Sequence, residues 1–548
     1  MSTENKRNKY MLWLPVTAAI CLVVGLWGGY FLSKYDPTLP SRHKLDNIFD
    51  IIDANYVENV SFDSLVELTV PDLLRNLDPH SSYISAKERT KANRDLEGSF
   101  YGIGISFQMM NDTLVVLEVI NGGAAESAGV LPGDKIITVD GDNIAGNGTQ
   151  TDDIFNRLRG PEGTPVSISV KRHNSPTPIT FDLIRGVVPV SPIDASYMIS
   201  DSIGYIRLGK FAENTYNEFL NVMAQLQYDG ATSFILDLRG NTGGYMNPAV
   251  LMANEFLHPG QLIVMTKGRI PSQDNILFAD GTGAFTNSPL VVLVDEFTAS
   301  SSEIMAGSMQ DNDRALIIGR RTFGKGLVQR SFELPDSSEF RLTVQRYYTP
   351  SGRCIQKTYT PGHNYEYEAE VYERYSKGEI FSADSIRVDS TEIFHTQSGR
   401  PVYGGGGIIP DIFIPSDTTG ITNYYLKVAN SGLLRNFAYE YADLNRENLT
   451  ESRDLAEMIT KLPTDGVLLQ SFVNYASQKG KVAPRWYYIN ISAPLIVNQL
   501  KALIARDILG MDGYFEIVNS TDPAVVEAVQ QLQSGKMHEQ LTNSKKDE

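Results

Sequence analysis

Apolar residues near the start of the chain form two different patterns. An uncharged stretch from Met11 to Leu32 is long enough to cross a bilayer as a helix. From Lys44 to Leu77 apolar residues recur at helical spacing, and Asp78-Pro79 ends this region because proline lacks the N–H that a helix needs. The pattern predicts a membrane-spanning helix followed by a small helical region.

Between residues 98 and 186 the pattern changes to that of β-strands. Apolar residues alternate with small or polar ones at 103–109 and again at 166–171. Short helices are predicted between these strands, at 124–128 and 152–159. Residues 98–186 therefore read as one compact, β-rich module.

From residue 187 to 415 apolar strands alternate with amphipathic helices. The strands at 234–238 and 290–295 are almost entirely apolar, as expected for a sheet that is covered on both faces. A polar insertion at 359–400, rich in Tyr and Glu, interrupts this α/β region, and helical spacing returns at 416–548. We therefore predict an α+β, multidomain protein with a helical C-terminal region.

Basic residues at the N-terminus predict how the apolar stretch is oriented. Three of them precede it, and positive charge stays on the cytoplasmic side of a membrane. Residues 1–9 would then be a cytoplasmic tail, 10–32 a single-pass signal-anchor in the inner (cytoplasmic) membrane, and 33–97 a stalk with the helical region. The rest would face the periplasm or exterior. A cleaved signal peptide is the alternative.

Composition excludes several classes of function. The formal net charge is −17, and no long run of Lys and Arg follows the first ten residues, which argues against nucleic-acid binding. Cys21 and Cys354 are the two cysteines, and Cys21 lies in the predicted span, so no intrachain disulfide is expected. None of the seven histidines pairs at ligand spacing, and we expect no metal or other cofactor.

A serine-rich segment follows the apolar strand at 290–295. Ser300 lies at the predicted junction of that strand with a helix, where free backbone amides and the helix dipole can stabilise an oxyanion. Ser300 and Glu303 also fit a capping box, so a purely capping serine is the alternative.

A glycine-rich segment at 319–326 contains one lysine, Lys325. The segment nearly matches a phosphate-binding loop, but Gly326 stands where that motif needs a hydroxyl, and a strand-like stretch follows, which disfavours nucleotide binding. A buried, neutral lysine can instead take a proton from a serine hydroxyl. A third segment is the glycine-rich turn at 240–244. One of its amides could be an oxyanion donor, or the segment could be only a flexible turn.

An ordered set of motifs resembles one known family, the carboxyl-terminal processing peptidases (tail-specific proteases, family S41). The motifs are Leu77–Tyr83, Gly129–Ile136, Asp237–Gly244, Thr298–Glu303, Gly307–Asp311, Thr322–Gln329 and Gly406–Asp411. The resemblance covers roughly residues 44–358 and 400–414. It implies that residues 98–186 are a PDZ domain, inserted before a serine-peptidase core of the ClpP/crotonase type at 187–415.

The resemblance also implies which residues carry the chemistry. Ser300, 25 residues before Lys325, corresponds to the nucleophile, Lys325 to the general base, and Gln329 to the residue that orients the lysine amine. The backbone amides of Gly243 and Ser301 correspond to the oxyanion donors, with the glycine after Gly243 as an alternative to it. Ser301 departs from the family, in which alanine is usual there, but it keeps the amide.

Within the PDZ-like module, the peptide-binding loop corresponds to Tyr101, Gly102, Ile103 and Gly104. Such a loop receives a peptide's terminal carboxylate while the peptide adds as a strand. The alternative is a purely structural β-domain. His80 lies in an Asp-Pro-His-Ser stretch that is typical of a capped turn and is not expected to be catalytic.

Together these observations predict a serine endopeptidase that recognises proteins or peptides by their free C-termini and cleaves extracytoplasmic substrates. The alternative is a non-catalytic PDZ scaffold on a protease-like core, which need not retain the serine, the lysine and the glutamine together. The predicted partners are peptide substrates, the membrane through the N-terminal helix, and further copies of the chain through residues 416–548. The family does not account for the insertion at 359–400.

Overall fold

The computed structural model describes residues 15, 17–27, 29, 39–93, 98–110, 112–120, 122–172, 175–387, 392–536 and 541. These residues belong to two compact units, 1–74 and 75–548. In the first unit, the predicted helical region forms helices α2 (Leu39–Asn55) and α3 (Phe62–Arg75), and the rings of Phe49 and Phe62 meet edge to face at 6.0 Å.

The predicted signal-anchor at 10–32 lies partly outside the described residues, and the predicted cytoplasmic tail at 1–9 lies wholly outside them. Residues 17–27 are helical. Within the described ranges, no helix is both long and apolar enough to cross a membrane. The anchor therefore stays a prediction from the sequence.

The β-rich module contains one six-stranded antiparallel sheet and two short helices. The sheet has the order β3-β4-β5-β7-β8, with β6 beside β5, and a separate pair joins β2 to β9. Its elements are β2 (Ser99–Gly102), β3 (Ile105–Met110), β4 (Thr113–Val119), α5 (Ala124–Ala128), β5 (Lys135–Val139), β6 (Asp142–Asn143), α6 (Thr151–Leu158), β7 (Pro165–Lys171), β8 (Ile179–Ile184) and β9 (Gly186–Pro189). Alternating side chains such as Val166, Ile168 and Val170 form its core, as the sequence pattern predicts.

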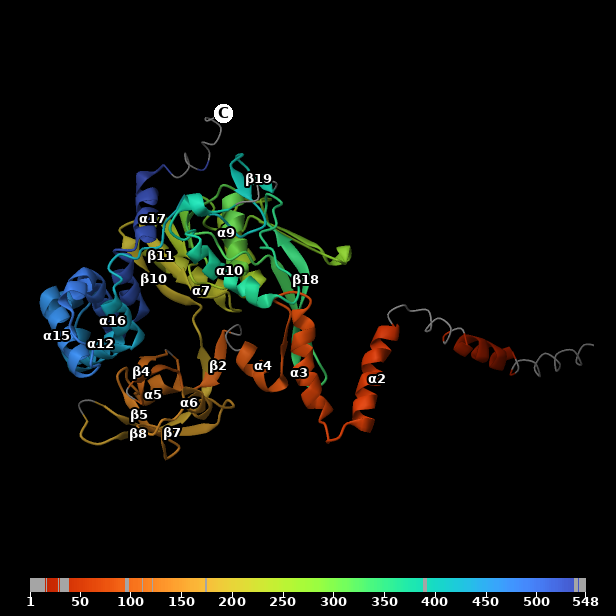
Figure 1. The fold of residues 1–548 in the computed structure, drawn as a ribbon. Helices are drawn as coiled ribbons and strands as arrows, with labels where there is room; N and C mark the ends of the chain where they lie inside the picture. Colours follow the sequence, from red (N-terminus) through yellow and green to blue (C-terminus); the bar gives the residue numbers. More distant parts are fainter. Residues whose placement is uncertain are drawn as a thin grey trace, which may run out of the picture. The chain divides into compact units, whose positions relative to one another are not determined.

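The α/β core is built on a six-stranded sheet with the order β10-β11-β12-β15-β16-β21. Its edge strand β10 and the next strand, β11, are labelled in Figure 1. All neighbours in this sheet are parallel except the edge strand β10 and β11. Its elements are β10 (Ile193–Ser200), β11 (Ile203–Leu208), α7 (Thr215–Tyr228), β12 (Ser233–Asp237), α8 (Met246–Phe256), β15 (Leu290–Val294), α9 (Ser301–Asp311), β16 (Leu316–Gly319) and β21 (Ile412–Phe413).

Both faces of this sheet are covered, which explains why its strands are continuously apolar. Helices α7, α8 and α9 pack on the face that includes Leu236 and Val292. The C-terminal helix α17 (Pro523–Ser534) packs on the other, against Ile235 and Val291. Helix α17 is therefore part of the core's packing.

A second, five-stranded sheet lies next to the core in the same unit. It has the order β1-β18-β13-β14, and β17 pairs with β18. Its strands and the short elements near them are β1 (Ser82–Ile84), α4 (Ala86–Asn93), β13 (Leu262–Gly268), η1 (Pro271–Gln273), β14 (Asn275–Phe278), β17 (Leu327–Glu333) and β18 (Glu339–Tyr348). Strand β17 begins directly after Lys325, and so this sheet anchors the loop that carries the lysine.

The insertion at 359–400 has secondary structure of its own. It forms α10 (Asn364–Ser376), η2 (Ala383–Ser385) and β19 (Ile393–His395), and β19 pairs with β20 (Pro401–Tyr403). Although its sequence is polar, α10 buries Tyr367, Val371 and Arg374 on one face.

The predicted helical C-terminal region is confirmed. It consists of α11 (Asn423–Asn430), α12 (Leu433–Leu444), α13 (Arg446–Thr450), α14 (Leu455–Lys461), α15 (Asp465–Gln478) and α16 (Trp486–Asn519), followed by α17. Figure 1 shows α12, α15 and α16 gathered in one bundle, and these helices share an apolar core. The bundle contacts the β-rich module through Tyr439, which packs on Met110 and Val115, and through an ion pair of Asp443 with Lys135 at 3.2 Å.

Candidate active site

Ser300 lies where strand β15 turns into helix α9, as the sequence predicts. Its backbone has φ 57° and ψ −118°, a conformation that residues with a side chain rarely adopt. The Glu303 carboxylate accepts a hydrogen bond from the Ser300 N–H at 2.9 Å. Glu303 thus supplies its half of the capping box, and the Ser300 side chain borders a cavity.

A cavity of about 490 Å³ brings most of the predicted catalytic residues together. Ser300, Ser301, Lys325, Gln329 and Gly244 all line it, although they come from three separate segments of the chain. The first two begin α9, the next two belong to the loop before β17 and to β17 itself, and the last belongs to the glycine-rich turn after β12. The parallel strands of the core sheet deliver two of these segments to the same edge.

Lys325 is largely buried, and this burial lowers the pKa of its amine. The negative charges of Glu303 and Asp78 oppose the shift, whereas the positive charge of Arg341 adds to it. Within the described chain, no hydrogen bond joins the lysine amine to the Ser300 hydroxyl. The two groups face one cavity, and direct proton transfer between them requires a small rearrangement or a bridging water.

Glu303 connects the serine turn to the lysine loop. It is fully buried, and its carboxylate accepts hydrogen bonds from Ser300 N–H (2.9 Å), Thr322 Oγ1 (2.6 Å), Gly324 N–H (2.8 Å) and Lys325 N–H (2.8 Å). Desolvation raises the pKa of this carboxyl, and the four donors act in the opposite direction. The sequence identified Glu303 only as a capping partner; the spacing of a capping box gave no signal for the contacts with the lysine loop.

The oxyanion donors expected from the sequence are only partly free. Gly243 lies against the nucleophile, since a Cβ on it would stand 2.7 Å from Ser300 Cβ. Its N–H, however, donates to Asn241 Oδ1 at 2.9 Å. Among the described residues, the amides of Gly244 and Ser301 have no hydrogen-bond acceptor. The geometry therefore favours Gly244, the alternative, as the donor from this turn.

Gln329 lines the cavity but does not contact the lysine amine. Its Nε2 donates to Thr343 Oγ1 at 3.2 Å, and Thr343 Oγ1 donates to Asp78 Oδ1 at 2.9 Å. Asp78 Oδ1 also accepts from the backbone N–H of His80 and Ser81, both at 2.9 Å. The Asp-Pro-His-Ser stretch thus forms the expected capped turn. Its Asp78 binds Thr343, and Thr343 in turn binds Gln329.

His80 is a structural residue with a strongly shifted pKa. Its Nε2 lies 2.9 Å from the Tyr367 hydroxyl of α10. Burial, together with the positive charges of Lys325 and Lys357, lowers its pKa to about 3, although Asp78 acts to raise it. The ring is therefore neutral near pH 7, and it is too weak a base to take up a proton there.

This shift predicts acid sensitivity of the fold. An unfolded histidine protonates near pH 6.5, whereas His80 in the folded protein protonates near 3. Stability is therefore fully present above the unfolded pKa and is lost as pH falls toward 3, by up to ~5 kcal/mol. We expect His80→Gln to flatten the loss of unfolding free energy between pH 6.5 and 4, measured by denaturant titration. His363→Gln, at an exposed histidine, should leave the pH dependence unchanged.

The predicted peptide-binding loop comprises the last two residues of β2, Tyr101 and Gly102, and the turn from β2 to β3. Tyr101 is 48% exposed, whereas Gly102, Ile103 and Gly104 are buried. Gly104 has φ +80°, and a Cβ there would come within 2.8 Å of the Gly123 Cα, so glycine is required.

Sequence reasoning did not identify Arg159 as a neighbour of this loop. Its guanidinium stacks on the ring of Phe100 at 4.1 Å and on that of Phe155 at 4.8 Å. Its Cγ would lie 3.7 Å from a Cβ on Gly102, and its Nη1 is buried and has no hydrogen-bond acceptor in the described chain. A single arginine at the end of a predicted helix gave no signal of this position.

Comparisons with known proteins agree with the geometry. The model of peptidase family S41 matches residues 202–364, and a PDZ-domain model matches residues 115–172. The carboxy-terminal-processing protease of Bartonella bacilliformis is 35% identical over 318 residues, which cover 57% of this chain and 72% of that protein. The chain belongs to the carboxyl-terminal processing proteases of family S41. It is accordingly a serine protease.

Two further relatives are similar to part of the chain. The carboxyl-terminal-processing protease of Synechocystis sp. is 37% identical over 297 residues, covering 53% of this chain and 68% of that protein. The solved structure of a photosystem II D1 C-terminal processing protease is 30% identical, with a TM-score of 0.31, and the match covers 57% of this chain and 89% of that one. Residues 424–510 match a family of unknown function.

The S41 assignment confirms the family that the motifs indicated, and the PDZ match lies inside the β-rich module. The residue roles stay predictions: the structure brings the serine, the lysine and the glutamine to one cavity, without the hydrogen bonds that those roles require.

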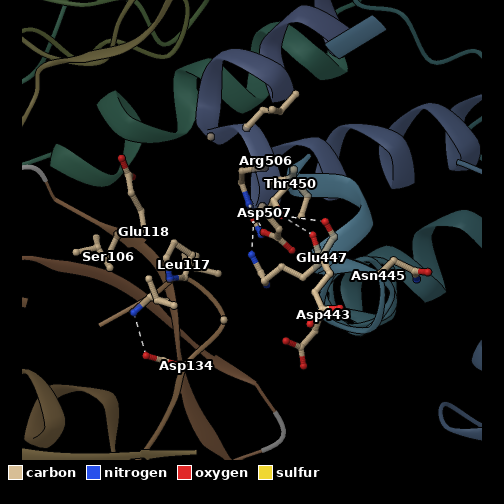
Figure 2. A pocket seen from close by; sticks show the side chains of 18 of the residues that line it. Ser106, Leu117, Glu118, Asp134, Asp443, Asn445, Glu447, Thr450, Arg506 and Asp507 are labelled. Atoms are coloured by element: carbon tan, nitrogen blue, oxygen red, sulfur yellow. Dashed lines mark hydrogen bonds and ion pairs between the residues drawn. The ribbon is translucent and has the colours of Figure 1, made fainter. Parts of the chain in front are cut away.

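The S41 protease also has a larger cavity, about 850 Å³, that none of the predicted site residues line. Figure 2 shows Leu117 and Asp134 of the PDZ domain on one side of it and Glu447, Arg506 and Asp507 of the C-terminal helices on the other. Arg506 donates to Asp507 Oδ1 at 3.0 Å. The cavity at Ser300 is therefore smaller than this one.

Proposed function

We propose that this chain is an endopeptidase of the Ser–Lys type that recognises the free C-termini of extracytoplasmic proteins and peptides. The observation that carries the proposal is the cavity at Ser300, where the serine, the desolvated Lys325 and the amides of Ser301 and Gly244 come together. A serine hydroxyl needs a neutral base to become a nucleophile. Burial supplies one, because it disfavours the charged form of lysine.

In the proposed reaction, Lys325 takes the hydroxyl proton as Ser300 Oγ attacks the carbonyl carbon of the scissile bond. The carbonyl oxygen becomes an oxyanion, which the amides of Ser301 and Gly244 stabilise. The lysine ammonium gives its proton to the leaving amine, the C–N bond breaks, and an acyl-enzyme remains. Water, deprotonated by Lys325, then hydrolyses the ester and restores both side chains.

Gln329 completes the proposed set as the residue that orients the lysine amine. Its place in the lining of the cavity supports this role. In the present structure its amide group instead donates to Thr343. The proposal therefore includes a rotation of this side chain when substrate binds.

The second part of the proposal concerns recognition by the PDZ domain. The loop 101–104 precedes strand β3, onto which a peptide would add as a further strand. Arg159 beside this loop carries a positive charge and a buried N–H without an acceptor. A terminal carboxylate supplies both the negative charge and the acceptor that this arginine lacks.

A pair of peptides tests recognition separately from chemistry. One peptide ends in a free carboxylate, and its twin carries a terminal amide but the same scissile region. We expect the amidated twin to be cut at least about tenfold more slowly at subsaturating concentration, because a charge-assisted contact is worth more than ~1.4 kcal/mol. Initial rates measured by chromatography decide this.

Two results would bear on that comparison differently. Gly104→Asp should slow cleavage of the free peptide and leave the amidated twin almost unaffected, since it alters the loop and not the cavity at Ser300. Equal rates for both peptides with the unchanged protein would exclude tail recognition, while the serine chemistry would stand.

The membrane anchor is also part of the proposal, and its support is the apolar stretch from Met11 to Leu32 with basic residues before it. A shortened chain, residues 33–548, should leave the membrane fraction and keep its kcat, because no residue of the proposed site lies before residue 78. Sedimentation of membranes with an activity assay measures both. A mature N-terminus near residue 30 would replace the anchor with a cleaved signal.

A further inference from the structure

Helix α10 of the insertion binds the backbone of the loop that carries Lys325. Arg374, which is 2% exposed, donates from Nη1 to the carbonyl of Thr322 at 2.8 Å and from Nη2 to the carbonyl of Phe323 at 3.1 Å. The amides of the same loop donate to Glu303 of α9 at 2.8 Å. An anionic side chain thus holds the N–H groups of the loop, and a cationic side chain holds its carbonyl groups.

The Arg374 side chain also makes a contact within α10 that fixes its orientation. Its Nε donates to Glu370 Oε1, one turn earlier on α10, at 2.7 Å. Glu370 also accepts from Lys357 Nζ at 3.0 Å and pairs with Arg321 at 3.5 Å. The planar guanidinium therefore has one fixed orientation, which suits two adjacent carbonyl groups.

A second residue of α10 reaches the far end of the loop. Gln356 accepts from the Gly326 N–H at 2.8 Å and donates through Nε2 to the Tyr367 hydroxyl at 3.1 Å. That hydroxyl lies 2.9 Å from Nε2 of His80. Helix α10 thus contacts the loop before Lys325 directly and the residue after it through one side chain.

The lysine loop needs such support because its own sequence provides little. Gly324 has φ +89°, and Gly326 follows the lysine, so the lysine lies between two residues with large conformational freedom. A small displacement of this loop would admit water to the amine and remove it from the serine. A displacement of about 1 Å can lower turnover by a factor of ~10².

We propose that Arg374 is a positioning residue for the catalytic base: by binding the carbonyls of Thr322 and Phe323 it fixes the backbone of Lys325 and keeps the lysine amine desolvated beside Ser300. The inference rests on the proposed Ser–Lys mechanism and extends it to an insertion that the family resemblance leaves unexplained. Helix α10 is then part of the catalytic apparatus.

The test must separate this role from ordinary stabilisation by a buried arginine. A merely structural residue changes the unfolding free energy and the amount of active enzyme, but not the pH at which activity appears. A positioning residue also changes the environment of the lysine. If the loop loosens, water reaches the amine, its pKa rises, and the limb of the kcat profile that requires neutral lysine moves to higher pH.

The experiment compares Arg374→Lys and Arg374→Gln with the unchanged full-length protein and with Lys377→Gln, an exposed basic residue near the end of the same helix. Arg374→Lys keeps the positive charge and much of the side-chain length, but it loses the planar guanidinium that binds two adjacent carbonyl groups. The charged and titratable groups that face Lys325 from other elements (Glu303 of α9, Arg341 of β18, Asp78 and the neutral His80 of the turn before β1) stay unchanged in all variants. Steady-state kcat and KM are measured on one peptide across pH.

We expect Arg374→Lys to lower kcat at pH 7 at least about tenfold and to leave KM within about twofold. The part of the kcat profile that rises with pH should move up by about one pH unit, because each unit by which the lysine pKa rises lowers the neutral fraction tenfold. Arg374→Gln should move the limb further, and Lys377→Gln should leave it in place. If Arg374→Gln does not fold, Arg374→Lys decides. A folded Arg374→Lys variant with the limb of the unchanged protein would overturn the inference, whatever its kcat.

Failure of the Ser–Lys mechanism itself would look different. In that case Ser300→Ala, assayed in parallel, would retain hydrolysis, and the proposed function would fall. With hydrolysis dependent on Ser300 and the limb unmoved in the Arg374 variants, only the role of Arg374 would be excluded.

Discussion

Ser300→Ala is expected to leave the protein folded and to lower peptide hydrolysis by more than ~10³-fold. Removal of one hydroxyl at a helix start costs little stability, whereas no acyl-enzyme can form without it. The capping contribution of Glu303 to this turn uses the backbone N–H of residue 300 and survives the change. Rates from a peptide assay, with circular dichroism as a check of folding, measure the effect.

A second serine of the same helix serves as the control. Ser308 is fully buried in α9, and its hydroxyl donates only to the Met305 carbonyl at 2.9 Å. Ser308→Ala should keep activity within about threefold, since loss of one such bond costs about 1 kcal/mol of stability. Near-normal turnover of Ser300→Ala would show that the nucleophile lies elsewhere.

Lys325→Arg is expected to be as inactive as Lys325→Ala. The guanidinium keeps its proton at any pH that the protein tolerates, so it cannot act as a base. In the unchanged protein, desolvation lowers the pKa of Lys325, and in the proposed mechanism the neutral form is the active one. Activity should therefore be low at acidic pH and rise with pH through an apparent pKa below the ordinary lysine value of about 10.4.

The pH profile offers a second way for this assignment to fail. The negative charges of Glu303 and Asp78 favour the charged form of Lys325. Added salt screens these charges, so it should not move the rise of activity with pH to higher pH. A limb near pH 6.5 would indicate a histidine base instead, and an active arginine variant would exclude Lys325 outright.

That Ser300 and the turn at 240–244 border one cavity could be predicted, because both segments follow strand ends. Ser300 follows a continuously apolar strand, and the turn at 240–244 follows another, and parallel strands deliver both to one edge of the sheet. The sequence also indicated Lys325 as the candidate base. Only the family motif, and not the periodicity of apolar residues, linked it to Ser300.

Which backbone amides are free could not be predicted. Gly243 and Gly244 are chemically identical in the sequence, and the difference between them is the Asn241 side chain, which occupies the first amide. That contact spans only two residues, as in an Asx turn. The contact of Gln329 with Thr343 depends instead on a residue of the neighbouring strand β18, and local sequence gives no signal for it.

The structure of the insertion could not be predicted for a different reason. Its sequence is polar and rich in Tyr and Glu, and Tyr365 and Tyr372 are exposed. Yet Tyr367, Val371 and Arg374 recur at helical spacing and are buried, and Arg374 binds the lysine loop. A buried arginine cannot be distinguished from an exposed one by pattern alone, since its role depends on the carbonyl groups that it meets.

The most direct test of the Ser300–Lys325 mechanism is to map the residue that a serine-directed fluorophosphonate modifies, by mass spectrometry of the full-length protein. The account predicts one phosphonyl group on Ser300, formed in parallel with loss of activity, and at least about a hundredfold slower modification of Lys325→Arg. Inactivation with the label on another residue would contradict it, as would an unchanged rate of modification in the arginine variant.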